Sequence, residues 1–110
     1  MKKYDDVKYW TAYTLAGLED WKQAIAVMPK NFGGIAGYPE EMRVPLILTF
    51  AEIALRNADV PLAYQLLDTL RPEISKLPLP YASYWNYLAG EAARQGGEPD
   101  KAIEYWTPLV

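Results

Sequence analysis

The chain has 110 residues, a formal net charge of −3, and neither cysteine nor histidine. The lack of cysteine excludes disulfides and thiolate chemistry, and the lack of histidine removes the commonest metal ligand and general base. The acidic balance disfavours nucleic acid as a partner, since nucleic-acid binding draws on clustered lysine and arginine side chains. We therefore expect a single domain of residues 1–110 with no catalytic site, no metal and no cofactor.

No membrane span and no signal peptide are predicted. The longest apolar stretch, Val44 to Leu55, contains Pro45 and Glu52 and is shorter than the roughly 20 residues that a span requires. Residues 1–3 resemble the start of a signal peptide, but Tyr4-Asp5-Asp6 follows where its apolar segment would begin.

Six amphipathic segments, joined by turn signals, are expected to form helices. The first covers about residues 5–17, and the second runs to Met28 from an N-cap at Asp20. Residues 29–39 then break the periodicity, with glycines and two bracketing prolines that predict a loop.

Four further helices are expected at about residues 40–57, 59–72, 80–95 and 98–110. Pro45 is an alternative start for the first of these, and Asp59 is the expected N-cap of the next. Gly96-Gly97 separates the last two. Because no segment alternates with period two over a useful length, the predicted fold class is all-α.

Small residues recur with a period of 39 residues. The first set is Ala24, Ala63 and Ala102, and a second set lies twelve positions earlier, at Ala12, Ala51 and Gly90. Small side chains allow two helix backbones to approach closely, so we expect the alanines to be buried where the helices of a hairpin cross. The period predicts three antiparallel helical hairpins, at about residues 5–30, 40–72 and 80–110, stacked as in a helical repeat protein.

Residues 83–106 resemble a tetratricopeptide repeat. Trp85, Leu88 and Ala89 match the opening of the motif, Gly96 marks its turn, and Ala102 and Trp106 match its second helix. The other two units match less well, and the period exceeds the family's roughly 34 residues. Related α-solenoid families remain an alternative. The resemblance implies an α-α superhelix that acts as a protein–protein interaction scaffold, with the partner held in a groove lined by the first helix of each hairpin.

Two sets of equivalent positions in the first helices, 39 residues apart, are expected to face outward. The first set is Tyr9, Leu48 and Tyr87, and the second is Tyr13, Glu52 and Glu91. The candidate partner-binding residues are Tyr9, Tyr13, Leu48, Glu52, Arg56, Tyr84, Tyr87, Glu91 and Arg94. Such a groove would suit a peptide with apolar and basic side chains. The alternative interpretation is that the tyrosines pack between repeats and that Glu52–Arg56 is a solvated helical pair.

The last helix ends on the apolar sequence Ile103 to Val110, without the polar capping helix that usually closes a solenoid. We therefore expect the chain to be a segment of a longer protein. The alternative is a homo-oligomer formed through exposed terminal faces. On that interpretation, the domain is a structural spacer or self-association module that uses those faces and the loop at residues 29–39.

Overall fold

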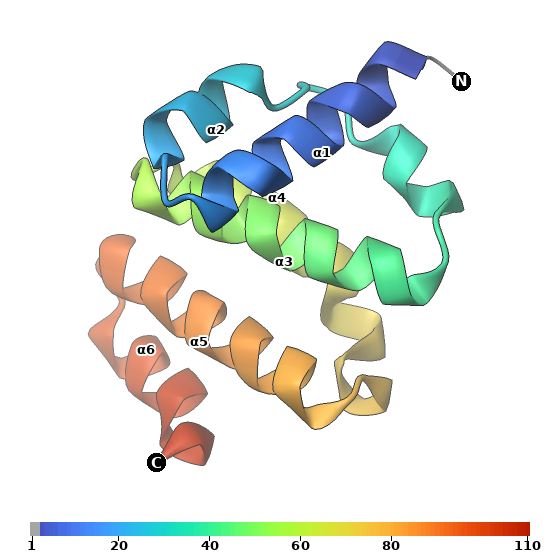
Figure 1. The fold of residues 1–110 in the computed structure, drawn as a ribbon. Helices are drawn as coiled ribbons and strands as arrows, with labels where there is room; N and C mark the ends of the chain where they lie inside the picture. The colour runs from blue at the N-terminus through green and yellow to red at the C-terminus, as the bar shows by residue number, and fades with distance from the viewer. Residues whose placement is uncertain (1–2) are drawn as a thin grey trace.

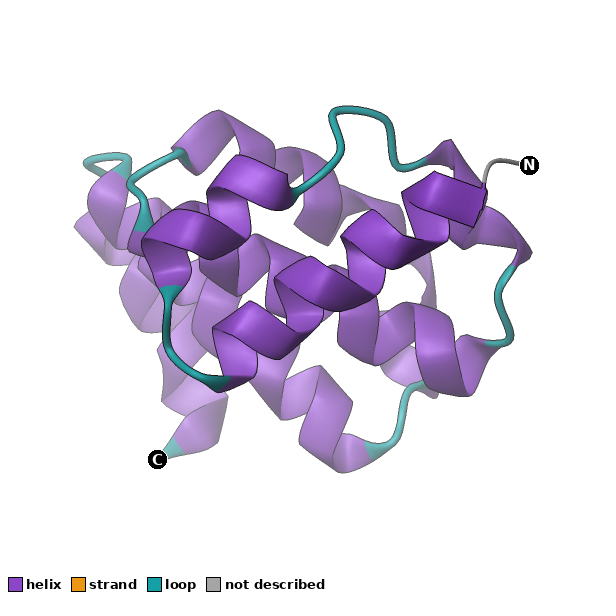
Figure 2. Cartoon of the chain, turned by 45° about the horizontal axis from the view of Figure 1, so that its top comes forward, coloured by secondary structure: helices purple, strands orange, loops and turns teal. Residues whose placement is uncertain are grey.

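The computed structural model describes the backbone of residues 3–110 and the side chains of residues 6–110. Residues 1 and 2, where the resemblance to a signal peptide begins, lie outside the described residues. Throughout the described chain, all regular elements are helical: six α-helices and three 3₁₀ helices (Figure 2). The predicted all-α class is confirmed.

The first hairpin consists of α1 (Lys3–Gly17) and α2 (Trp21–Val27). The Asp20 carboxylate accepts a hydrogen bond of 3.3 Å from the backbone N–H of Gln23, which confirms Asp20 as the N-cap of α2. The helix ends one residue before the predicted Met28, which has an extended backbone.

The segment at residues 29–39 is better ordered than the prediction of a loop implied. It contains the 3₁₀ helix η1 (Gly33–Gly37), and Ile35 within it is buried. Tyr38 stacks on Trp10 of α1 with ring centroids 6.1 Å apart. This segment is therefore packed onto the first hairpin.

The second hairpin consists of α3 (Glu40–Arg56) and α4 (Val60–Leu70). Helix α3 starts at the earlier of the two predicted positions and carries Pro45 inside its second turn, where the proline ring removes the N–H that would bond to the Glu41 carbonyl. Asp59 caps α4, because its carboxylate accepts a hydrogen bond of 3.2 Å from the backbone N–H of Leu62. The 3₁₀ helix η2 (Arg71–Lys76) follows α4, so the α-helix ends just before Pro72, as predicted.

The third hairpin consists of α5 (Leu79–Gln95) and α6 (Pro99–Trp106). The turn between them uses Gly97 at φ +81°, a left-handed conformation that favours glycine. Helix α6 was predicted to reach the end of the chain, but it gives way to the 3₁₀ helix η3 (Thr107–Leu109). Pro108 explains the change, because it lacks the N–H that an α-helix would use there.

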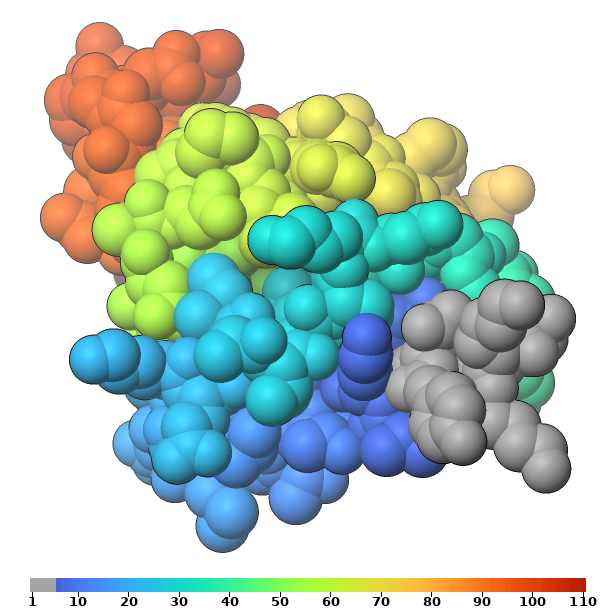
Figure 3. Space-filling model, turned by 90° about the horizontal axis from the view of Figure 1, so that it is seen from above, coloured from blue at the N-terminus to red at the C-terminus, as the bar shows by residue number. Residues whose placement is uncertain are grey.

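Each hairpin packs on the next through its first helix: α3 contacts both α1 and α5 (Figure 1). Seen from above, the first and last hairpins lie at opposite ends of the molecule (Figure 3). The small residues of the 39-residue register are all buried, as predicted: Ala12, Ala24, Ala51, Ala63, Gly90 and Ala102. No helix in the described part of the chain is long and apolar enough to cross a membrane.

Candidate partner-binding face

Helices α1, α3 and α5 together form one face that holds two adjoining depressions. The first, of about 240 Å³, lies between α1 and α3 and includes Tyr13, Glu52 and Tyr84. The second, of about 120 Å³, lies between α3 and α5 and includes Glu52, Arg56, Tyr87 and Glu91. Glu52 lines both, so the two depressions adjoin on α3. We call these six residues, with Arg94 beside them, the α1–α3–α5 face.

Glu52 lies at the centre of this face and joins α3 to α5. One of its carboxylate oxygens accepts a hydrogen bond from the Tyr84 hydroxyl, and the other accepts a bond of 3.1 Å from Arg56 Nη2. Burial raises the pKa of the Tyr84 hydroxyl well above its usual value, and the Glu52 carboxylate adds to the rise. Tyr84 is therefore a neutral hydrogen-bond donor throughout the physiological pH range.

Arg56 links the same face to the first hairpin. Its guanidinium lies over the Trp21 ring, 4.9 Å from the centroid, in a cation–π contact. The adjacent Asn57 donates a hydrogen bond of 2.9 Å to the Trp21 carbonyl. Trp21 thus fixes the position of the helix end that carries Arg56.

Glu91 is held by two donors on its own helix. Arg94 Nε and Gln95 Nε2 each donate a hydrogen bond of 2.9 Å to its carboxylate. The Arg94 hydrogen bond is the main reason that the pKa of Glu91 lies below its usual value. Gln95 Nε2 also donates to the Leu55 carbonyl at 3.0 Å, which ties α5 to α3.

The charges on this face are unequally accessible. The side chains of Glu52 and Glu91 are 17% and 22% exposed, whereas those of Arg56 and Arg94 are 51% and 56% exposed. The two carboxylates are recessed and accept hydrogen bonds from these same arginines, so the guanidinium groups are the more accessible charges. The groups most exposed on this face are the guanidinium groups of Arg56 and Arg94 and the rings of Tyr13 and Tyr87.

Tyr9 and Leu48 do not lie on this face, so their predicted outward position is wrong. They are 1% and 0% exposed. Tyr9 packs against Phe50 of α3, with ring centroids 6.0 Å apart, and its hydroxyl donates to the Asn31 carbonyl at 3.1 Å. The position of Tyr9 in the 39-residue repeat therefore faces the next hairpin. Tyr87, at the equivalent position of α5, is 44% exposed because no further helix packs beyond it in the described structure.

The remaining predicted residues lie at the surface or border of the depressions. Tyr13 is exposed and makes an edge-on contact with Trp10, at 5.6 Å between ring centroids. The prediction did not include Trp21 and Thr49, which line the first depression. Trp21 is partly buried and also packs against the hydrophobic core. Its place directly after the Asp20 cap was the one signal that it lies at a hairpin end, within reach of a neighbouring helix.

Nothing in the described part of the chain forms a group of three potential metal-ligating side chains. In comparisons with known proteins, no family model, no curated protein and no solved structure matches this chain.

Proposed function

We propose that this domain is a non-catalytic protein-interaction module, built as a short tetratricopeptide-like stack of three hairpins. It holds a segment of a partner protein across the α1–α3–α5 face. The observation that carries this proposal is that three helices from three hairpins contribute side chains to two depressions that share Glu52. A surface built in this way suits an extended segment that crosses the helices.

The chemistry of the face favours a particular partner segment. Tyr13 and Tyr87 are the exposed aromatic rings, and such rings provide apolar contact area at low entropic cost. Arg56 and Arg94 bind Glu52 and Glu91 through Nε and Nη2, but their side chains are more than half exposed, so the guanidinium donors outside those pairs can bind a carboxylate of the ligand. The preferred ligand is therefore a peptide with an apolar side chain and an acidic side chain a few residues apart.

A phage-displayed library of random peptides tests this proposal directly. Selection on the wild-type domain should enrich peptides that combine apolar and acidic residues. Binding of an enriched peptide should weaken about tenfold or more in each of two variants, Tyr13→Ala and Arg56→Gln, because each removes a contact worth about 1.4 kcal/mol. Neither residue lies in the buried core.

The matched control is Gln65→Ala, which changes an exposed residue on α4, away from the face. Its affinity for the enriched peptide should equal that of the wild type. If selection enriches no sequence, or if the two face variants bind as well as the control, the assignment of the face is wrong.

A further inference from the structure

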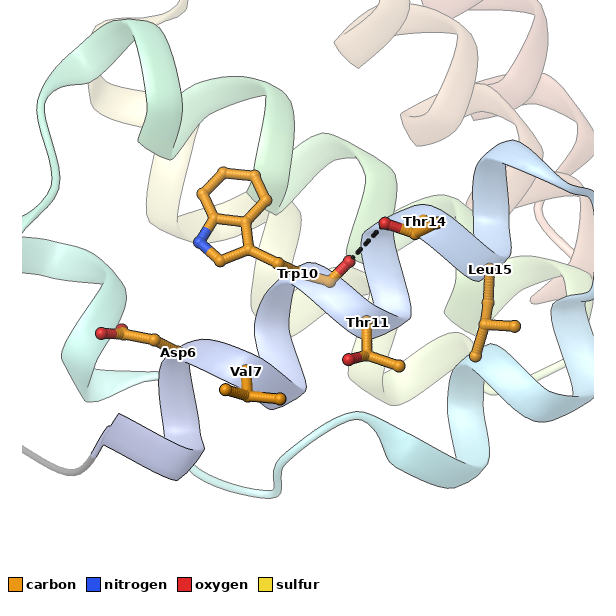
Figure 4. Close-up of a pocket in the computed structure, with 6 residues that line it drawn as sticks. All are labelled: Asp6, Val7, Trp10, Thr11, Thr14 and Leu15. Atoms are coloured by element: carbon orange, nitrogen blue, oxygen red, sulfur yellow. Dashed lines mark hydrogen bonds between the residues drawn. The ribbon is translucent and has the colours of Figure 1, made fainter.

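The first hairpin carries an apolar depression that no other part of the described chain covers. It has a volume of about 500 Å³ and is lined by six residues of α1. Figure 4 shows the side chains of Val7, Thr11 and Leu15 pointing to the same side of that helix. Val7, in the second turn of α1, is 61% exposed.

The 39-residue register shows what this surface corresponds to inside the molecule. The counterparts of Val7, Thr11, Thr14 and Leu15 in α3 are Leu46, Phe50, Ile53 and Ala54, all fully buried. Their counterparts in α5 are Trp85, Ala89, Ala92 and Ala93, which are buried as well. Phe50 contacts Tyr9 of the preceding hairpin. The exposed side of α1 is therefore the position at which α3 and α5 each receive a preceding hairpin.

The opposite end of the molecule carries the complementary half of the same interface. Tyr87, Ile103 and Leu109 are all exposed. Their counterparts 39 residues earlier are Leu48, Tyr64 and Leu70, of which Leu48 and Leu70 are fully buried and Tyr64 is partly buried. The surface that each hairpin offers to the next is thus left uncovered on the last hairpin.

We propose that copies of this chain associate head to tail. The exposed side of the first hairpin, around Val7 and Thr11, receives the last hairpin of a second copy, around Ile103 and Leu109. The contact continues the interface that already joins the three hairpins. Because the two surfaces are different halves of that interface, the association is heterologous and forms short open chains of copies.

Two features make this association weak. Thr11 and Thr14 replace the Phe50 and Ile53 of the internal interface, so less apolar surface is available on the receiving side. Each copy also carries a net charge of −3, which opposes association. We expect the average mass to rise above the 12.5 kDa of one chain only at concentrations of about 0.1–1 mM.

Analytical ultracentrifugation of the wild type and two single variants tests both the contact and its direction. Val7→Glu disrupts the contact surface on the first hairpin, and Ile103→Glu disrupts the contact surface on the last hairpin. Because both residues are exposed, folding should be unaffected. Each variant alone should stay monomeric. An equimolar mixture should form dimers and nothing larger, because each variant retains the half that the other has lost.

Leu79→Glu is the matched control, since Leu79 is exposed but belongs to neither end surface, and it should associate like the wild type. A wild type that stays monomeric throughout overturns the proposal. So does a Val7→Glu variant that still dimerises, which would show pairing of like ends, or a mixture that fails to restore dimers. Both variants should still bind the selected peptide. A failure of self-association can therefore be distinguished from a failure of the proposed function.

Discussion

The indole of Trp106 lies directly on Gly90. A Cβ atom added to Gly90 would come within 2.1 Å of the indole nitrogen, and that nitrogen donates a hydrogen bond of 3.1 Å to the Tyr87 carbonyl. In the first two hairpins, the counterparts of Gly90 are alanines, and those of Trp106 are Met28 and Leu67. The third hairpin therefore has glycine because the side chain that packs there is the largest of the three.

Replacing Gly90 with alanine should displace Trp106. Alanine stabilises a helix relative to glycine by about 0.5–1 kcal/mol. Its methyl group would, however, displace the Trp106 indole and break the hydrogen bond from the indole to the Tyr87 carbonyl. We expect Gly90→Ala to be neutral or destabilising in the wild type. Urea unfolding measures the free energy, and the tryptophan fluorescence should shift to longer wavelength as Trp106 moves into water.

A second background separates these two effects. In a Trp106→Ala protein, the same Gly90→Ala change has no indole to displace, so it should stabilise by about 0.5–1 kcal/mol. Equal effects in both backgrounds would show that Gly90 and Trp106 are not coupled.

Ala63 tests the packing of the hairpin itself. This residue is fully buried in α4, so Ala63→Leu should lower the free energy of unfolding by about 1–3 kcal/mol through overpacking. Gln65→Leu adds the same side chain to an exposed position on that helix and should have little effect. Denaturant unfolding of the two variants gives the comparison, and an equal loss in both would argue against close packing at Ala63.

Local signals and the repeat period were sufficient to predict much of the fold. Asp20 and Asp59 were identifiable as caps because a capping interaction involves residues two or three apart. The buried alanines followed from their spacing. The packing of the segment at residues 29–39 could not be predicted, because Tyr38 stacks on Trp10, which is 28 residues earlier in the sequence.

The candidate face was predicted only in part, because a period does not specify which side of a helix faces solvent. Tyr9 and Tyr13 are one helical turn apart, which separates their directions by only about 40° around the axis. In a stack, that rotation is enough to turn a side chain from the neighbouring hairpin towards solvent. Tyr9 packs on Phe50, while Tyr13 is exposed.

Tyr84 should give the protein a measurable loss of stability at alkaline pH. Its pKa is raised in the folded state, so its contribution is complete below the unfolded pKa of about 10 and falls as pH rises above it. The loss from this group should approach about 1.4 kcal/mol per pH unit. Tyr38, whose pKa burial and the Asp6 hydrogen bond raise to about 12, should add a second loss.

Tyr84→Phe removes the first of these contributions. The variant should be about 1 kcal/mol less stable than the wild type at pH 7, because the bond to Glu52 is lost. Above pH 10 the difference should narrow. Urea unfolding from pH 7 to pH 11 gives the free energy difference at neutral pH and its change above pH 10, with Tyr87→Phe as a control for loss of a more exposed hydroxyl. A constant difference across this range would contradict the role assigned to Tyr84.

The Arg43–Glu73 pair should stabilise the protein at neutral pH and lose that effect in acid. The pair joins α3 to η2 through two parallel hydrogen bonds of 2.9 and 3.0 Å, and it is partly buried. The Arg43 hydrogen bond lowers the pKa of Glu73, so the stabilisation is present above the unfolded value of about 4.3. The stabilisation is lost as the pH falls through the lower pKa that Glu73 has in the folded state. Glu73→Gln should therefore cost about 1 kcal/mol at pH 7 and nothing in strong acid.

Glu98→Gln is the matched control for that change. Glu98 pairs with Lys101 at 3.4 Å, but both side chains are about half exposed or more, and such pairs contribute little to stability. Denaturant unfolding of both variants from pH 7 down to pH 3 should show a difference from the wild type that shrinks only for Glu73→Gln. A loss that is equal at pH 7 and pH 3 would mean that the glutamate stabilises η2 by packing, because only the ionic contribution depends on protonation.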